Sequence, residues 1–124
     1  MSSIAIYLWF NAVLYAAFTI WCLLRPTATA AFSGLSLLNT SGRSEYFALY
    51  VGLEGAWALL FALCALKPEW QFAGMLNAVF IYAGLICGRW ISILQKGVAS
   101  SNTYYIAALE VALGIWGILL FLKM

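Results

Sequence analysis

Four apolar stretches, each about as long as a bilayer is thick, dominate this chain. They run roughly over residues 3–24, 43–66, 70–94 and 103–122. A bilayer core is about 30 Å thick, so a helix that spans it needs about 20 mostly apolar residues. Inside lipid the backbone must satisfy its own hydrogen bonds, which favours a helix for each stretch. We therefore predict an all-α, polytopic membrane protein, with residues 1–124 forming one bundle of four transmembrane helices.

The composition excludes several classes of protein. Of the 124 residues 66% are hydrophobic and 8% are charged, and a soluble domain of this size could not cover such a surface with polar groups. The net charge of +2 comes without a basic cluster, so we expect no nucleic-acid partner. There is no histidine, and the sequence contains no CxxC pair, nucleophile–base pair or phosphate-binding loop. We therefore expect no metal, no cofactor and no enzymatic activity.

The connections between the stretches set the order of the helices. Arg25-Pro26 should end the first helix, because proline disfavours helix in the residue before it. Residues 26–42 carry apolar side chains at helical spacing among serines and threonines, which predicts a short helix in the membrane interface between helices one and two. The tight break at Lys67-Pro68-Glu69 predicts that helices two and three are antiparallel neighbours. Both termini should then lie on the same side of the membrane.

Two of the apolar stretches contain a carboxylate. Glu54 and Glu110 each lie 13 residues before a lysine, Lys67 and Lys123. At a rise of 1.5 Å per residue, each carboxylate should lie about 10 Å below the opposite surface of the membrane core. Ionisable residues at such a depth are costly and rare, and they usually mark a functional site.

Arg89 of the third stretch is expected at the same depth, about 9 Å below that surface. We predict that it pairs with one or both glutamates, and that either one glutamate carries a proton or Arg43 reaches down to it. An ion pair that only fixes helix packing is the alternative, but hydrophobic residues would do that at lower cost. The predicted polar layer and ligand-binding set consists of Arg43, Tyr50, Glu54, Tyr82, Arg89 and Glu110.

Small residues at intervals of three and four predict faces where helices approach closely. The glycines expected at such contacts are Gly52, Gly84, Gly88, Gly114 and Gly117. Four helices leave little room for a solute path within one chain. We therefore expect a homo-oligomer, with a trimer ahead of a dimer.

Three short motifs carry a resemblance to a known family: Tyr50-Val51-Gly52, Gly88-Arg89-Trp90-Ile91-Ser92 and Lys96-Gly97-Val98. With them the chain resembles a family of small bacterial four-helix membrane proteins that is catalogued as a domain of unknown function. It is more distantly similar to DoxX-like proteins, some of which accompany quinone-linked oxidoreductases. The resemblance implies a multi-pass protein of the bacterial inner (cytoplasmic) membrane.

Our leading functional hypothesis is a non-enzymatic protein that supports the integrity and permeability barrier of the cell envelope. It would act as a homo-oligomer that binds a membrane lipid or another hydrophobic small molecule near the Glu/Arg layer. One alternative is a small proton-linked transporter or channel that uses Glu54 and Glu110. A second, which rests on the distant resemblance, is a DoxX-like accessory subunit of a quinone-linked oxidoreductase.

Overall fold

The computed structural model describes all 124 residues and contains helices but no strand. Its elements are α1 (Ser3–Leu24), α2 (Pro26–Phe32), α3 (Thr40–Tyr46), the π-helix η1 (Phe47–Leu53), α4 (Glu54–Leu66), the 3₁₀ turn η2 (Pro68–Trp70), α5 (Gln71–Lys96) and α6 (Asn102–Leu122). Elements α3, η1 and α4 form one continuous helix. Four helical segments are long and apolar enough to cross a membrane: Ser3–Leu24, Thr40–Leu66, Pro68–Lys96 and Asn102–Leu122. The predicted all-α architecture with four spanning helices is confirmed.

The helices begin and end where the sequence places local signals. The Ser2 hydroxyl accepts a hydrogen bond from the Ala5 N–H at 3.1 Å and caps α1. Pro26 then occupies the first position of α2, where its missing N–H costs nothing. The Asn39 side chain accepts a hydrogen bond from the Gly42 N–H at 2.9 Å and caps α3, so the second spanning helix begins at Thr40.

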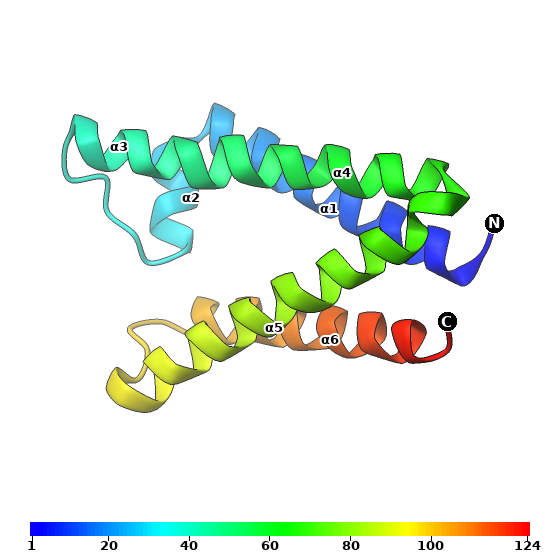
Figure 1. Cartoon of the computed structure of the whole chain (residues 1–124). Coiled ribbons are helices and arrows are strands. Elements are labelled where there is room, and N and C mark those ends of the chain that lie inside the picture. Colours follow the sequence, from blue (N-terminus) through cyan, green and yellow to red (C-terminus); the bar gives the residue numbers. More distant parts are fainter.

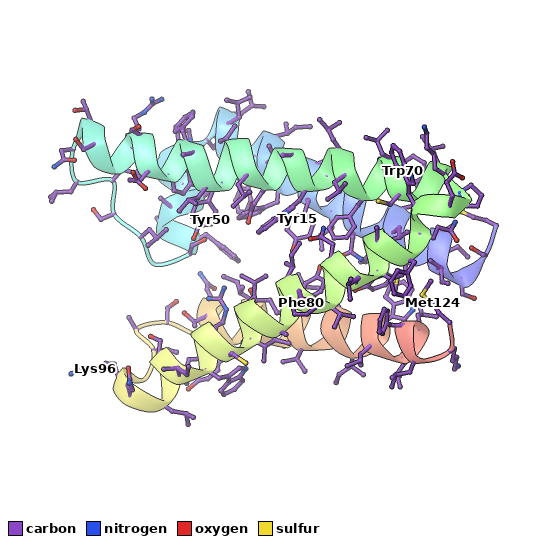
Figure 2. All side chains as sticks on the ribbon, in the orientation of Figure 1. Tyr15, Tyr50, Trp70, Phe80, Lys96 and Met124 are labelled. Carbon is purple, nitrogen blue, oxygen red and sulfur yellow. The ribbon has the colours of Figure 1, made fainter.

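The four spanning helices form two pairs that splay apart. The first pair consists of α1 and the continuous α3–η1–α4 helix, and the second consists of α5 and α6. Figure 1 shows the pairs close together at the end that holds both termini and diverging toward the other end. In Figure 2, Trp70 and Met124 lie at the closed end and Lys96 lies at the open end. Both termini are therefore at one end of the bundle, as the sequence predicts.

A dense core joins the pairs at the closed end. Leu8, Phe61 and Met75 are completely buried there. Gly74 of α5 lies so close to α4 that a Cβ atom on it would be 2.7 Å from Cβ of Cys64. Packed interiors do not tolerate such an overlap, so only glycine fits at this position.

A polar network fixes α1 against the second pair. The Tyr7 hydroxyl donates to the backbone carbonyl of Leu113 at 2.9 Å, and the Asn11 side-chain amide donates to the Tyr7 carbonyl at 2.9 Å. The Tyr82 hydroxyl donates to the Asn11 side-chain carbonyl. Asn11 is fully buried, and residues of α1, α5 and α6 all contribute to this network, so it ties the three helices together.

The predicted short helix after helix one is confirmed as α2, which occupies the first part of residues 26–42. Helix α2 ends at Phe32, and the chain turns at Gly34, whose φ of +81° favours glycine. Leu35 and Leu38 therefore lie outside the helix. Thr29 is fully buried and shares a hydrogen bond with the hydroxyl of Tyr46, which fastens α2 to the second spanning helix.

The second spanning helix contains a π-helix that the sequence does not predict. Over Phe47–Leu53 the helix widens, and the N–H of Glu54 bonds to the carbonyl of Leu49, five residues back. Each wide turn changes which side chains share a face. Such π segments are rare and often lie at functional sites. Here the segment directly precedes Glu54.

The five predicted packing glycines divide into two groups. A Cβ on Gly114 would lie 3.3 Å from Tyr82, and one on Gly117 would overlap the ring of Tyr7, so close approach is confirmed at these two positions. No other helix of the chain approaches Gly52, Gly84 or Gly88, so a helix contact at these three glycines stays a prediction. A small-residue pattern describes a smooth helix face, but it does not specify what covers that face.

Candidate ligand-binding cavity

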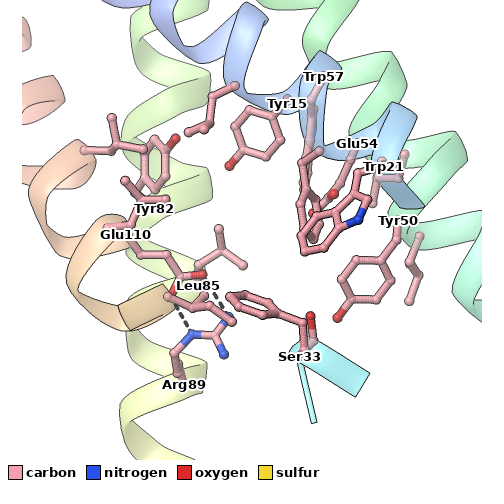
Figure 3. Close-up of a pocket in the computed structure, with 18 of the residues that line it drawn as sticks. Tyr15, Trp21, Ser33, Tyr50, Glu54, Trp57, Tyr82, Leu85, Arg89 and Glu110 are labelled. Carbon is pink, nitrogen blue, oxygen red and sulfur yellow. Dashed lines mark hydrogen bonds and ion pairs between the residues drawn. The ribbon is translucent and has the colours of Figure 1, made fainter. Parts of the chain in front are cut away.

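A cavity of about 540 Å³ lies between the two helix pairs (Figure 3). All four spanning helices line it, together with the segment that follows α2. Fifteen of its nineteen lining residues are hydrophobic. The lining residues are Leu14, Tyr15, Phe18, Trp21, Phe32, Ser33, Leu35, Leu49, Tyr50, Leu53, Glu54, Trp57, Tyr82, Leu85, Arg89, Ile106, Leu109, Glu110 and Leu113.

Arg89 and Glu110 form a bidentate ion pair in the cavity wall made by the second helix pair. Nε of Arg89 donates to Oε1 of Glu110 at 2.5 Å, and Nη2 donates to Oε2 at 2.9 Å. Arg89 lies seven residues before the end of α5 and Glu110 nine positions into α6, so the two side chains are about 10–12 Å from their helix ends. The predicted pairing and common depth are confirmed for these two residues.

Glu54 has no such partner. It lies on the first helix pair, across the cavity from Arg89 and Glu110 in Figure 3. Its Oε2 atom is buried and makes no hydrogen bond. Burying a polar group without a partner is costly, and a charged group more so. The choice left open by the sequence is thus resolved in favour of Glu110 as the partner of Arg89.

The cavity lining contains more acidic than basic residues. The lining contains one arginine and two glutamates, which gives a formal charge of −1 when all three are ionised. The Arg89–Glu110 pair is neutral as a unit, and both carboxylate oxygens of Glu110 are occupied. The unbalanced charge therefore belongs to Glu54.

Aromatic rings form much of the wall around Glu54. Tyr15 and Trp57 meet edge to face with their ring centroids 5.9 Å apart. Trp21 packs on Phe32 at 5.6 Å, which brings the segment after α2 onto the cavity. Figure 2 shows Tyr15 and Tyr50 projecting from the first helix pair toward the second. Seven of the lining residues are aromatic: Tyr15, Phe18, Trp21, Phe32, Tyr50, Trp57 and Tyr82.

The structure brings together five of the six residues predicted for the polar layer, namely Tyr50, Glu54, Tyr82, Arg89 and Glu110. Tyr82 serves the core as well, through its hydrogen bond to Asn11. The prediction for Arg43 is wrong. Arg43 is exposed and does not line the cavity, and its guanidinium lies 4.2 Å from the ring centroid of Phe47. The Phe47 ring, one turn further along the helix, gives the Arg43 guanidinium a cation–π contact at the surface of the protein.

Several lining residues were not singled out from the sequence. Trp57 follows Glu54 by three positions, so helical spacing alone could have placed both on one face. Tyr15, Phe18 and Trp21 repeat at every third position of α1, a pattern that is equally typical of lipid contact or an aromatic belt. Phe32, Ser33 and Leu35 could not have been found, because their place depends on how α2 folds back.

No group of three or more histidine, cysteine, aspartate or glutamate side chains lies close enough to hold a metal ion. The three cysteines are unpaired. The polar and aromatic groups that the cavity offers are one neutral ion pair, one unpaired carboxyl group, the Ser33 hydroxyl, and the hydroxyl and ring groups of its aromatic residues.

A comparison with protein-family models matches residues 3–121 to a domain of unknown function, DUF4345. The chain belongs to this family. The DUF4345 match spans all four membrane-length helices and the whole cavity. No curated protein and no solved structure matches the chain.

Proposed function

We propose that this DUF4345 protein is a non-enzymatic membrane protein that holds one hydrophobic molecule, a lipid or another small molecule, between its two helix pairs. The cavity carries this proposal. Its volume of about 540 Å³ falls in the range of small-molecule sites, and most of its lining is apolar. A few polar groups at one level, Glu54 and the Arg89–Glu110 pair, would orient the bound molecule.

The proposal extends to the place and assembly of the protein. We propose that it resides in the bacterial inner membrane, as the family resemblance implies. We also propose that it supports the permeability barrier of the envelope. Gly84 and Gly88 give α5 a smooth, exposed face that no helix of the same chain covers. This face supports a homo-oligomer in which protomers meet along α5, with a trimer ahead of a dimer.

Native mass spectrometry after extraction in a mild detergent tests the binding function. A bound molecule should appear as one discrete added mass per chain, and solvent extraction would then yield the molecule for identification. The matched variants are Leu109→Trp and Leu119→Trp. Both leucines lie on α6 and are partly exposed, at 45% and 54%, but only Leu109 lines the cavity.

We expect Leu109→Trp to lose the added mass, because the larger ring fills the cavity. Leu119→Trp should keep it. The proposal would be contradicted if the wild-type protein showed no added mass beyond the detergent and lipid masses seen on both variants. The same spectra report the number of chains per particle, and a monomer that persists in mild detergent would count against the oligomer.

The unpaired carboxyl group of Glu54 supports a second candidate, a proton-linked transporter. In that case a solute gradient should drive proton movement in proteoliposomes, and Glu54→Gln should abolish it. Glu69→Gln, an identical change at an exposed residue outside the cavity, should leave it intact. Binding without any solute-coupled proton flux would support the holding function over transport.

A further inference from the structure

We infer that the molecule held in the cavity is an organic cation, an amine or onium centre on an apolar body, whose charge lies beside Glu54. This inference rests on the proposed binding function and names the class of its ligand. Three features of the cavity carry it: its charge balance, its aromatic lining and its shortage of oxygen ligands.

The charge balance disfavours an anionic ligand. The guanidinium of Arg89 would be the natural anchor for a phosphate or a carboxylate, but two of its N–H groups already bind Glu110. An anion that approached Arg89 would meet the carboxylate of Glu110 beside it and Glu54 across the cavity. A cation at Glu54 would instead compensate the one carboxylate in the cavity lining that has no partner.

The aromatic residues favour a cation of low charge density. The faces of tryptophan and tyrosine rings attract cations, and rings that surround a site are a recurring means of binding alkylated ammonium groups. Trp57 lies one turn after Glu54 and Tyr50 one turn before it, and both line the cavity. Trp21 and Tyr15 add two rings from α1. A carboxylate among rings is a combination that suits a large organic cation.

The same lining does not suit an inorganic cation. Magnesium and calcium require about six or more oxygen ligands, and they take these from several carboxylates, carbonyls and waters. The cavity offers one carboxyl group that is not already paired, and 15 of its 19 lining residues are hydrophobic. A small, strongly hydrated ion could not recover its hydration energy there, whereas the apolar body of an organic cation would contact the leucines and rings.

Calorimetric titration in a non-ionic detergent tests the inference with two probes of nearly the same shape. Methyltriphenylphosphonium is a cation, and triphenylphosphine oxide is neutral. Each probe is titrated into wild-type protein, into Glu54→Gln and into Glu69→Gln, with empty micelles subtracted. Glu69 is exposed and lies outside the cavity, so Glu69→Gln is the matched control.

We expect wild type and Glu69→Gln to bind the phosphonium about tenfold more tightly than the oxide, which is the effect of one modest charge interaction. Glu54→Gln should bind the two probes alike. Equal affinity of the wild type for both probes would overturn the inference and leave the proposed binding function intact. This comparison uses the wild-type protein alone, so it does not depend on the folding of any variant. If neither probe binds while native mass spectrometry still shows a retained molecule, the inference fails and the binding function stands.

Discussion

Arg89 occupies both carboxylate oxygens of Glu110, through Nε at 2.5 Å and Nη2 at 2.9 Å, and thereby joins α5 to α6 in one wall of the cavity. The opposite wall presents Glu54, whose Oε2 is buried without a partner. Of the two glutamates that line the cavity, one is thus neutralised by Arg89. The other acid remains available to a bound molecule or a proton.

Removal of Arg89 should destabilise the protein severely. Arg89→Ala leaves Glu110 in a membrane-embedded wall without its counter-charge, and breaking a buried pair from one side costs about 3–5 kcal/mol. We expect a lower melting temperature and a lower yield after detergent extraction. Adding Glu110→Gln should recover part of the loss, because the second change removes the orphaned charge.

The matched double variant is Arg89→Ala with Glu54→Gln. Glu54 forms no ion pair with Arg89 in the structure, so this combination should remain as unstable as Arg89→Ala alone. Rescue by Glu54→Gln rather than by Glu110→Gln would show that the ion pair is assigned to the wrong glutamate.

Loss of one hydroxyl from the network around Asn11 should also be measurable. Tyr82→Phe removes the donor to the fully buried Asn11 side chain and leaves its carbonyl oxygen unsatisfied. Such a loss typically costs about 1–3 kcal/mol. Tyr105→Phe is the control, because Tyr105 is 69% exposed and its hydroxyl makes no hydrogen bond within the chain. Equal melting temperatures for the two variants would mean that the network contributes little.

Two glycines on α5 should respond in opposite ways to the same change. Gly74→Ala forces a methyl group to 2.7 Å from Cys64, and we expect a destabilisation of about 1–3 kcal/mol. Gly84→Ala adds a methyl group in open space within the chain, where alanine favours the helix by up to about 1 kcal/mol. Thermal unfolding in detergent compares the two. A destabilised Gly84→Ala would point to a contact between protomers at that face.

The sequence predicts those features that depend on local composition. Hydropathy and the breaks at Arg25-Pro26 and Lys67-Pro68 were sufficient to place the four spanning helices within a few residues. The rise of the helix was sufficient to place Arg89 and Glu110 at one depth. Both inferences depend only on distance along the helix axis, and the separation of two residues in the sequence determines that distance.

The features that the sequence does not predict depend on rotation about a helix axis or on tertiary contact. The π-helix over Phe47–Leu53 has no compositional signature, although it changes the faces that Arg43 and Tyr50 occupy. The two helix pairs pack closely around Gly74 at the closed end and diverge toward the other end, an arrangement that no local sequence signal specifies. The cavity wall formed by Phe32 and Ser33 depends on the return of the chain after α2.

Cation binding should be linked to proton binding at Glu54. A protonated carboxyl group cannot compensate a cation, so the affinity for methyltriphenylphosphonium should rise as the pH is raised through the titration of Glu54. About one proton should be released per cation bound on the acidic side of that titration, and none on the basic side. The other titratable or charged groups that line the cavity are Tyr15, Tyr50, Tyr82, Arg89 and Glu110. Calorimetry in buffers of different ionisation enthalpy measures the release. Glu54→Gln should bind independently of pH, and a pH-dependent Glu54→Gln would assign the linkage to another of these groups.

The most direct test of the ligand site uses nuclear magnetic resonance of the side-chain carboxyl carbons. The chain has four acidic residues, all glutamate, so isotopic labelling gives four signals that single Glu→Gln changes assign. Only Glu54 and Glu110 line the cavity, and only Glu54 lacks a partner there. On addition of methyltriphenylphosphonium the Glu54 signal should shift most, while the signals of Glu45 and Glu69 stay in place. A probe that binds and leaves the Glu54 signal unmoved would contradict the account.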